Sequence, residues 1–329
     1  SAYEPDVFAV VRKVLSDIGY SSEGIAMDTF VHQQSPDIAG AVDTSKERRE
    51  GVSDNQMDWF QGAGDQGVMI GYACDETKQL MPIPVVLANR IVRELSACRQ
   101  SSYIQGILPD GKAQVTVEYE NGKPVRLDSV VVSCQHTEDK NLKKLEAEIR
   151  KKVLLPALRL LPPDEDTKNF YQSIRSFCLR RHGCRYGTDR KEVDGRQLWQ
   201  HGSHGGGAFS GKDCSKVDRS VAYMARYIAK NIVAARLASR CQVSLAYAIG
   251  VAQPVMVQVD TFGTGKVCAD DCLELAIPLV FGLTPKQIVD SLRLTRPIFR
   301  QTAAFGHFGR KEFPWERTDK VEALRNAVI

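Results

Sequence analysis

The chain has 329 residues, 43% of them hydrophobic and 26% charged, a composition typical of soluble globular proteins with room for two or three domains. It contains no run of about 18 or more apolar residues, which excludes an uninterrupted transmembrane helix, and its first residues lack the apolar core of a secretory signal. Its nine cysteines follow neither a disulfide nor a zinc-site spacing. They favour reduced thiols and a cytoplasmic location.

In the first half of the chain, apolar residues at helical spacing predict helices over Glu4–Gly19, Leu80–Arg99 and Asn141–Leu155. Thr44–Trp59 is charged and is expected to form a mobile loop. Gly62–Gly67, continued by Gly71-Tyr72-Ala73, is expected to form a glycine-rich loop that carries Asp65. Alternating apolar and polar residues predict strands over Ala113–Tyr119 and Val125–Cys134, joined by a tight turn at Glu120–Lys123.

In the second half, strands are expected over Cys241–Val251 and Val255–Thr261, broken by Pro254. Helices are expected over Ser215–Ser239, Asp270–Phe281 and Pro285–Leu292. Strand pairs that alternate with helices indicate an α+β protein whose sheets are covered by helices on one face.

The stretch GGGAFSGKD, residues 205–213, is the most informative local pattern. Its four glycines leave main-chain N–H groups open to an anion, and Lys212 and Lys216 follow at the start of a helix that Asp213 or Ser215 is expected to cap. A helix N-terminus of this kind suits phosphate. On these residues alone, a glycine-rich turn before a solvated surface helix explains the pattern equally well.

Two long motifs in the same order, GAGDQGVMIGYA from Gly62 and GGGAFSGKD from Gly205, resemble the signatures of the S-adenosylmethionine synthetase (methionine adenosyltransferase) family. QSPDIA from Gln34, LPDGK from Leu108, YAIGV from Tyr247 and TAAFGHFGR from Thr302 fit the same family. The resemblance extends over nearly the whole chain. It implies three similar βαβ-like domains, here divided as a remnant over 1–56 with a gating loop, a central domain over 57–171 and a C-terminal domain over 172–329.

The resemblance also implies a reaction, in which the sulfur of L-methionine attacks the 5′ carbon of ATP and the released triphosphate is hydrolysed to pyrophosphate and phosphate. The implied catalytic residues are Lys112 and Lys212. The implied ATP-binding residues are Asp110, Gly111, Lys112, Ala208 and Lys212. The implied methionine-binding residues are Asp65, Lys216 and Asp218. Mg²⁺ and K⁺ are the implied cofactors, and a homodimer or homotetramer without nucleic acid or membrane partners is the implied assembly.

Two regions depart from the family pattern. The family's opening His-Pro-Asp-Lys segment, with its catalytic His and its Mg²⁺ and K⁺ ligands, has no counterpart, so the first domain is expected to be incomplete and no metal ligand is assigned. Residues Gln172–Gln200 replace a glycine-rich segment that ends in Gly-Arg-Lys and a strand. They hold seven Lys or Arg against three Asp or Glu, a net charge of +4 that equals the charge of the whole chain.

A reading-frame error explains the second departure. Writing Gln172 as CAA, Ser173 as TCC, Ile174 as ATC and Arg175 as CGG, and dropping the first base, gives Asn-Pro-Ser-Gly. Continued through allowed codons, this frame reads NPSGRFVFGGTAADTGLTGRKLMVDSYG, which closely resembles the missing segment. As the chain stands, the family's substrate-binding Asp becomes Arg185, and its Arg-Lys pair becomes Lys191 and Glu192. Because several charge stabilisers of the triphosphate are lost, the chain as written is expected to be nearly inactive.

Three hypotheses follow. The chain is a synthetase with a frame error, a non-catalytic subunit or pseudoenzyme of the same family, or a basic protein that binds nucleic acid through Arg175–Arg196. The third hypothesis is disfavoured because this charge lies in one short segment with few interleaved aromatic residues.

Overall fold

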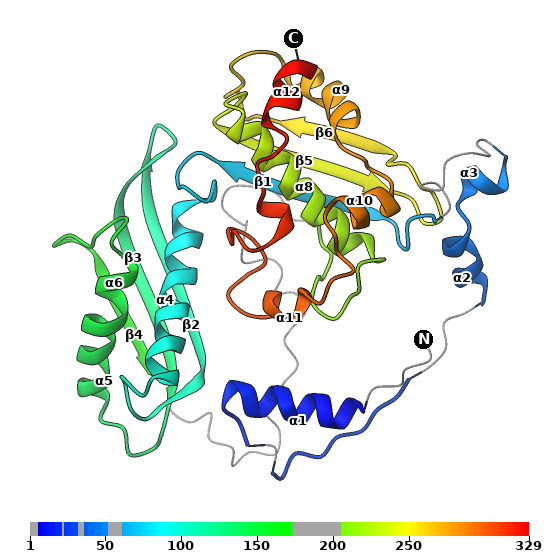
Figure 1. Ribbon diagram of the computed structural model, residues 1–329. Coiled ribbons are helices and arrows are strands. Elements are labelled where there is room, and N and C mark those ends of the chain that lie inside the picture. The colour runs from blue at the N-terminus through cyan, green and yellow to red at the C-terminus, as the bar shows by residue number, and fades with distance from the viewer. Residues whose placement is uncertain (1–5, 22, 32–35, 52–60, 174–204, 329) are drawn as a thin grey trace. The chain divides into compact units, whose positions relative to one another are not determined.

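The computed structural model describes residues 6–21, 23–31, 36–51, 61–173 and 205–328. The chain forms two compact units, each described by itself below (Figure 1). The first unit comprises Ser1–Gln34 and Leu87–Cys184, and the second comprises Ser35–Val86 and Arg185–Ile329. The division into three domains expected from the sequence stays a prediction, and the frame-altered stretch from Ile174 to Gln200 lies outside the described residues.

The first unit is built on a three-stranded sheet in the order β2-β3-β4. Strands β2 (Ile107–Glu120) and β3 (Lys123–His136) form the predicted antiparallel hairpin, and β4 (Lys168–Ser173) pairs in parallel with β3. The hairpin turn has φ of 50° at Asn121 and 73° at Gly122. Positive φ at both central residues defines the mirror-image turn that matches the twist of the strands, and Asn-Gly adopts it readily.

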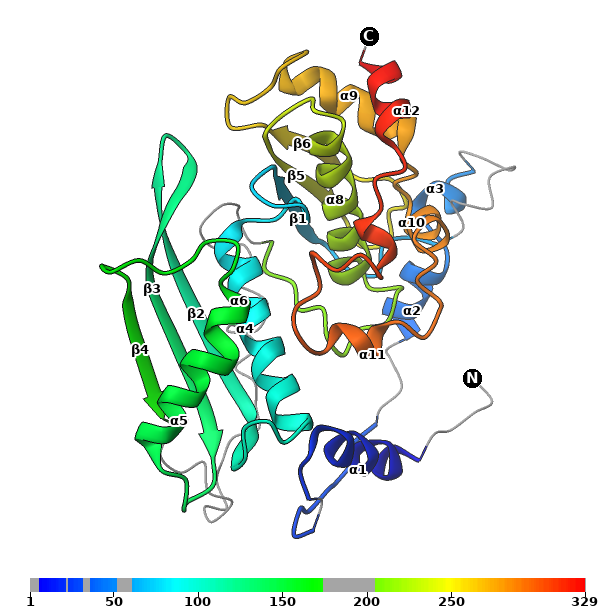
Figure 2. The same ribbon diagram turned by 60° about the vertical axis from the view of Figure 1, so that its left-hand side comes forward.

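Helices cover one face of this sheet, as the α+β prediction requires (Figure 2). They are α4 (Ile83–Gln100), which begins in the second unit, α5 (Leu142–Ile149) and α6 (Leu155–Ala157). A π-helical turn at Arg150–Leu154 separates α5 from α6, so the single helix predicted over Asn141–Leu155 is interrupted. Pro156 explains the interruption, since it has no N–H to donate to the carbonyl four residues earlier. Helix α1 (Val7–Ile18) confirms the amphipathic helix predicted near the start of the chain.

The second unit has a three-stranded antiparallel sheet in the order β1-β5-β6. Its strands are β1 (Gly67–Cys74), β5 (Arg240–Tyr247) and β6 (Met256–Asp260). Helix α8 (Val217–Ala234) crosses one face of the sheet and is buried on nearly every side (Figure 1). The other helices in the described part of this unit are α2 (Pro36–Asp43), α3 (Lys46–Arg49), α9 (Asp270–Val280), α10 (Pro285–Ser291), α11 (Phe299–Thr302), the 3₁₀ turn Pro314–Glu316 and α12 (Val321–Ala327).

One expectation about this unit is wrong, and a second is wrong in its first residues. Gly71-Tyr72-Ala73 belongs to strand β1 and not to a loop, and Gly71 is needed because a Cβ atom there would lie 2.1 Å from main-chain atoms of Ala225 and Arg226 in α8. The glycine therefore allows the helix to pack closely on the sheet. The loop expected over Thr44–Trp59 begins instead as helix α3, whose Glu47 accepts hydrogen bonds from the N–H groups of Ala252 and Gln253. Residues 52–60 of that loop lie outside the described residues.

Candidate functional site

The glycine-rich segment 205–211 leads to α8, and its glycines are required for two different reasons. A Cβ atom at Gly205 would lie 2.1 Å from the carbonyl oxygen of Val68, and one at Gly207 would lie 2.6 Å from the carboxyl group of Asp218. Gly206 and Gly211 instead adopt φ of 89° and 85°. Close packing against β1 and Asp218 thus explains two of the four glycines that the sequence alone suggested were open to an anion. Ala208 is half-buried in the same segment.

Lys212 follows this segment and forms an ion pair with Asp218 in the first turn of α8. The Lys212 side chain is 32% exposed and that of Asp218 16% exposed, so the pair lies at the surface with one side open to solvent. Helix α8 begins at Val217 with Lys216 as its N-cap residue, and no side chain caps it. The expected cap is therefore wrong, because the Asp213 side chain accepts a hydrogen bond from Ser215 N–H (2.7 Å) within the preceding turn.

The loop that precedes β1 lies against the start of α8. A Cβ atom at Gly64 would lie 3.2 Å from the carbonyl oxygen of Ser215 and 3.9 Å from Nζ of Lys216. Asp65 is the next residue, is half-buried, and accepts a hydrogen bond from Gln66 N–H (2.9 Å). Four charged residues implied by the resemblance, Asp65, Lys212, Lys216 and Asp218, thus come from two loops and a helix that converge at one end of the β1-β5-β6 sheet.

The triplet Asp110-Gly111-Lys112 belongs to the first unit, where it lies on β2. The pairing of β2 with β3 shifts register between Ile107 and Gly111, so the triplet begins within a β-bulge or similar irregularity. The side chain of Gln135 accepts a hydrogen bond from Asp110 N–H (3.4 Å), and Lys112 is exposed. Bulges often re-aim side chains at functional sites.

Sequence patterns do not single out the buried residues next to Lys212. Arg219 is 3% exposed and donates hydrogen bonds to the main-chain oxygen of Lys212 (2.6 Å), to Oγ1 of Thr302 (2.7 Å) and to the hydroxyl of Tyr223 (3.1 Å). Tyr223 also shares a hydrogen bond with Nδ1 of His307 (2.8 Å). Burial lowers the pKa of His307 to about 4, so its ring is neutral at pH 7.

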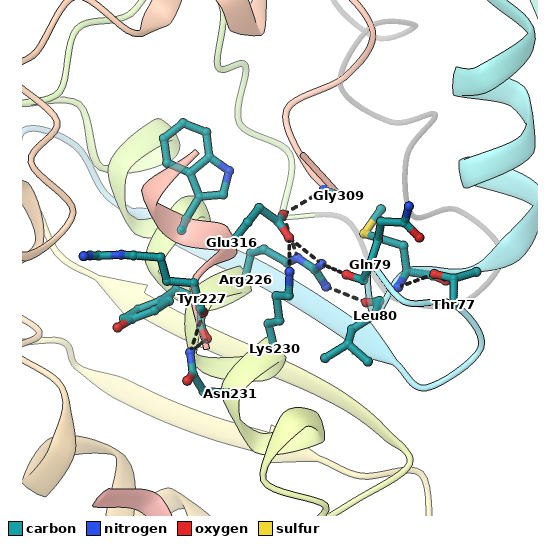
Figure 3. Close-up of polar contacts among 12 residues, drawn as sticks. Thr77, Gln79, Leu80, Arg226, Tyr227, Lys230, Asn231, Gly309 and Glu316 are labelled. Carbon is teal, nitrogen blue, oxygen red and sulfur yellow. Dashed lines mark hydrogen bonds and ion pairs between the residues drawn. The ribbon is translucent and has the colours of Figure 1, made fainter. Parts of the chain in front are cut away.

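The second missed group is a buried ionic cluster farther along α8 (Figure 3). Oε1 of Glu316 accepts from Arg226 Nε (3.1 Å) and Gly309 N–H (2.8 Å), while Oε2 accepts from Arg226 Nη2 (2.9 Å) and Lys230 Nζ (2.7 Å). Arg226 also donates to the carbonyl oxygens of Tyr72, Gln79 and Leu80 at 2.8–2.9 Å. The five N–H groups of its guanidinium are thereby used. The cluster fixes β1 and its following turn to α8 and to the C-terminal segment.

Comparison with known proteins places these observations in a family. The family model described as "S-adenosylmethionine synthetase, central domain" matches residues 60–177, and the model described as "S-adenosylmethionine synthetase, C-terminal domain" matches residues 188–317. The chain belongs to the S-adenosylmethionine synthetase family. It is 48% identical over 335 aligned positions to an S-adenosylmethionine synthase of Parafrankia sp. (strain EAN1pec), covering 98% of this chain and 84% of that protein.

Membership in the S-adenosylmethionine synthetase family confirms the resemblance drawn from the two glycine-rich motifs, and with it the α+β fold. Residues 178–187, inside the segment expected to be out of frame, lie between the two matches. In the described part of the chain no single helix is long and apolar enough to cross a membrane. Helices α9 and α10 reach that length and composition only as a pair, with a bend of 76° between them.

Proposed function

We propose that this protein makes S-adenosylmethionine from ATP and L-methionine, with hydrolysis of the released triphosphate to pyrophosphate and phosphate. The observation that carries the proposal is the ammonium group of Lys212, which lies beside a glycine-rich loop at the start of α8, in a chain that belongs to the S-adenosylmethionine synthetase family. The leaving triphosphate gains negative charge in the transition state. A positioned ammonium group stabilises that charge more than it stabilises bound ATP.

The described contacts suggest how Lys212 exchanges partners. Its ammonium group is paired with the carboxylate of Asp218. A triphosphate carries several negative charges, so it competes for Lys212 and leaves Asp218 beside the forming sulfonium, where a carboxylate is favourable. Ala208 offers main-chain contact to ATP. Asp65 and Lys216 lie toward methionine.

The triplet Asp110-Gly111-Lys112 completes the proposed ATP contacts, with Lys112 on the phosphates. Its position at an irregularity in the β2–β3 pairing supports a functional role for the triplet within its own unit. Mg²⁺ and K⁺ are the proposed cofactors. Among the described residues no group of three or more His, Cys, Asp or Glu side chains could hold a metal ion, so these residues do not supply a metal site and no step is assigned to one.

The remaining proposals concern the setting of the reaction. We expect a cytoplasmic homodimer or homotetramer without membrane or nucleic-acid partners. The segment Gln172–Gln200 should lower the rate, because Glu192 replaces a lysine beside the triphosphate. Two unit charges about 4 Å apart in an effective dielectric of about 20 interact by about 4 kcal/mol. The replacement therefore removes an attraction of that size and adds a repulsion of the same size. The alternative function, a non-catalytic subunit, is favoured by the same segment, since its residues 178–187 match neither family model.

The test compares two full-length proteins, one with Gln172–Gln200 as written and one with this segment restored to the family's reading frame. Each is supplied with ATP, methionine, Mg²⁺ and K⁺, and S-adenosylmethionine is measured by chromatography. The restored protein should form S-adenosylmethionine at least about 100-fold faster, the effect of regaining one preorganised charge. If the restored protein forms none, the proposed reaction is wrong and the non-catalytic alternative is preferred.

A further inference from the structure

We propose that Arg219 is a positioning residue for Lys212 and that it holds the main chain of this lysine in place while the lysine side chain binds a polyphosphate. The inference rests on the proposed function, because it concerns the same phosphate site. Two consecutive residues in the first turn of α8 hold Lys212 from opposite ends. Asp218 pairs with its ammonium group, and Arg219 donates to its carbonyl oxygen at 2.6 Å.

The main chain at Lys212 needs such a support. The preceding Gly211 has φ of 85°, a conformation that glycine leaves readily, and the following Asp213 is exposed. The N–H of Lys212 makes one long hydrogen bond to the carbonyl oxygen of Phe209 (3.2 Å), and Arg219 makes the shorter one to the lysine's own carbonyl oxygen. A flexible lysine directs its charge accurately only if its Cα atom is fixed.

Arg219 is itself held on several sides. Its other two hydrogen bonds go to Thr302 in α11 and to Tyr223 one turn along α8. Its guanidinium carbon lies 3.7 Å from the centre of the Phe299 ring. The three acceptors, a carbonyl and two hydroxyls, are neutral. A buried cation with neutral acceptors is costly to keep unless it serves the surrounding structure. Here its planar fork joins the glycine-rich loop to α8 and α11.

This geometry makes Arg219 act through Lys212, which a double-mutant cycle can detect. The probe is inorganic tripolyphosphate, titrated calorimetrically into the chain. Arg219→Met should weaken binding about tenfold or more, the worth of a hydrogen bond to a charged group. Arg219→Lys should weaken it similarly, because a compact ammonium group cannot span the three separate acceptors that Nε, Nη1 and Nη2 of the planar guanidinium reach. In a Lys212→Ala background, Arg219→Met should change the affinity less than about twofold.

Each alternative outcome overturns the inference. Equal losses from Arg219→Met with and without Lys212 would show a general structural role. Full affinity in Arg219→Lys, with loss in Arg219→Met, would show that charge and not position matters. If the wild-type chain does not bind tripolyphosphate, the phosphate site of the proposed function fails together with this inference, whereas binding that Arg219→Met leaves unchanged overturns the positioning role alone.

A milder variant covers the case in which Arg219→Met does not fold. Thr302→Val keeps the side-chain shape but removes the acceptor of Arg219 Nη2, and it should weaken tripolyphosphate binding at least about twofold. The matched control is Thr264→Val, which removes a hydroxyl that bonds to main-chain groups at the opposite end of β5. Unfolding midpoints of both variants should be similar. Equal affinities in the two threonine variants would contradict the positioning role.

Discussion

Replacing Glu316 by Gln tests the buried ionic cluster of the second unit most severely. The Glu316 side chain is 0% exposed, and those of its partners Arg226 and Lys230 are 1% and 9% exposed. Glutamine keeps the shape of the side chain but places an N–H₂ group where Oε1 or Oε2 now accepts hydrogen bonds, so two donors face each other. The substitution also leaves two cations without a counter-charge. Breaking a buried ion pair by removing one partner costs about 3–5 kcal/mol. For a unit of this size the unfolding midpoint should fall by about 10 °C.

The free energy of unfolding is measured by urea titration followed by circular dichroism, on wild type, Glu316→Gln and the control Glu322→Gln. Glu322 pairs with Arg325 on the surface of α12 and is 79% exposed, so its loss should change stability by less than about 1 kcal/mol. The slope of the unfolding free energy against urea concentration should be the same for the three proteins, as expected when only stability changes. A loss in Glu316→Gln that is no larger than the loss in Glu322→Gln would refute the reasoning.

The same variant should alter the acid sensitivity of the protein. Burial raises the pKa of Glu316, but the positive charges of Arg226 and Lys230 outweigh burial and leave the pKa below its usual value of 4.5. A carboxylate with a lowered folded-state pKa stabilises the fold above its unfolded pKa, and this stability is lost as pH falls through the folded pKa. The stability of Glu316→Gln should therefore vary less with pH below 4.5 than that of wild type.

Three further predictions follow from particular residues. Burial lowers the pKa of His307 from 6.5 to about 4, so between these two pH values the unfolded state binds a proton that the folded state does not. As pH falls from 6.5 to 4, the free energy of unfolding should therefore decrease by up to about 3 kcal/mol. His307→Asn should remove this pH dependence in unfolding titrations at about pH 4–7. Gly71→Ala should destabilise the protein by about 3 kcal/mol or more by pushing α8 off the sheet, whereas Gly40→Ala, with open space around it in α2, should be neutral or slightly stabilising. Independent sequencing of the codons for Gln172–Gln200 should restore Gly-Arg-Lys and Asp-Ser-Tyr-Gly, and unchanged bases together with a protein mass that includes the basic segment would disprove the frame error.

Local patterns in the sequence predicted the elements whose stability is local. The Asn121-Gly122 turn fixed the β2-β3 hairpin because its positive φ values suit few other residues. The apolar spacing of α8 and α9 predicted both helices to within a few residues. The family resemblance assigned Asp65, Lys212, Lys216 and Asp218 to the substrate site, and the structure places them on segments near the start of α8. Their roles with ATP and methionine stay predictions.

Features that depend on contacts between distant segments were not predictable. Glycines at 62, 64, 67 and 71 indicated a loop, although Gly71 lies in a strand because of α8, more than 150 residues later. Helical spacing alone does not mark Arg219 and Arg226 as buried residues. They are buried because segments around Thr302 and Glu316 close over α8 and supply acceptors 83 and 90 residues away. No periodicity along the helix contains that information.

The rate of S-adenosylmethionine formation by a Lys212→Ala variant tests the role of the glycine-rich loop most directly. The measurement uses full-length, frame-restored protein with ATP, methionine, Mg²⁺ and K⁺, and Lys266→Ala as the control, an exposed lysine beyond β6. Lys212→Ala should lower kcat by about 100- to 1,000-fold and raise KM for ATP much less, because the lysine acts mainly as the triphosphate leaves. Lys266→Ala should change kcat less than about twofold. A Lys212→Ala variant with wild-type kcat would contradict the phosphate site and leave this lysine as a partly exposed residue whose partner is Asp218.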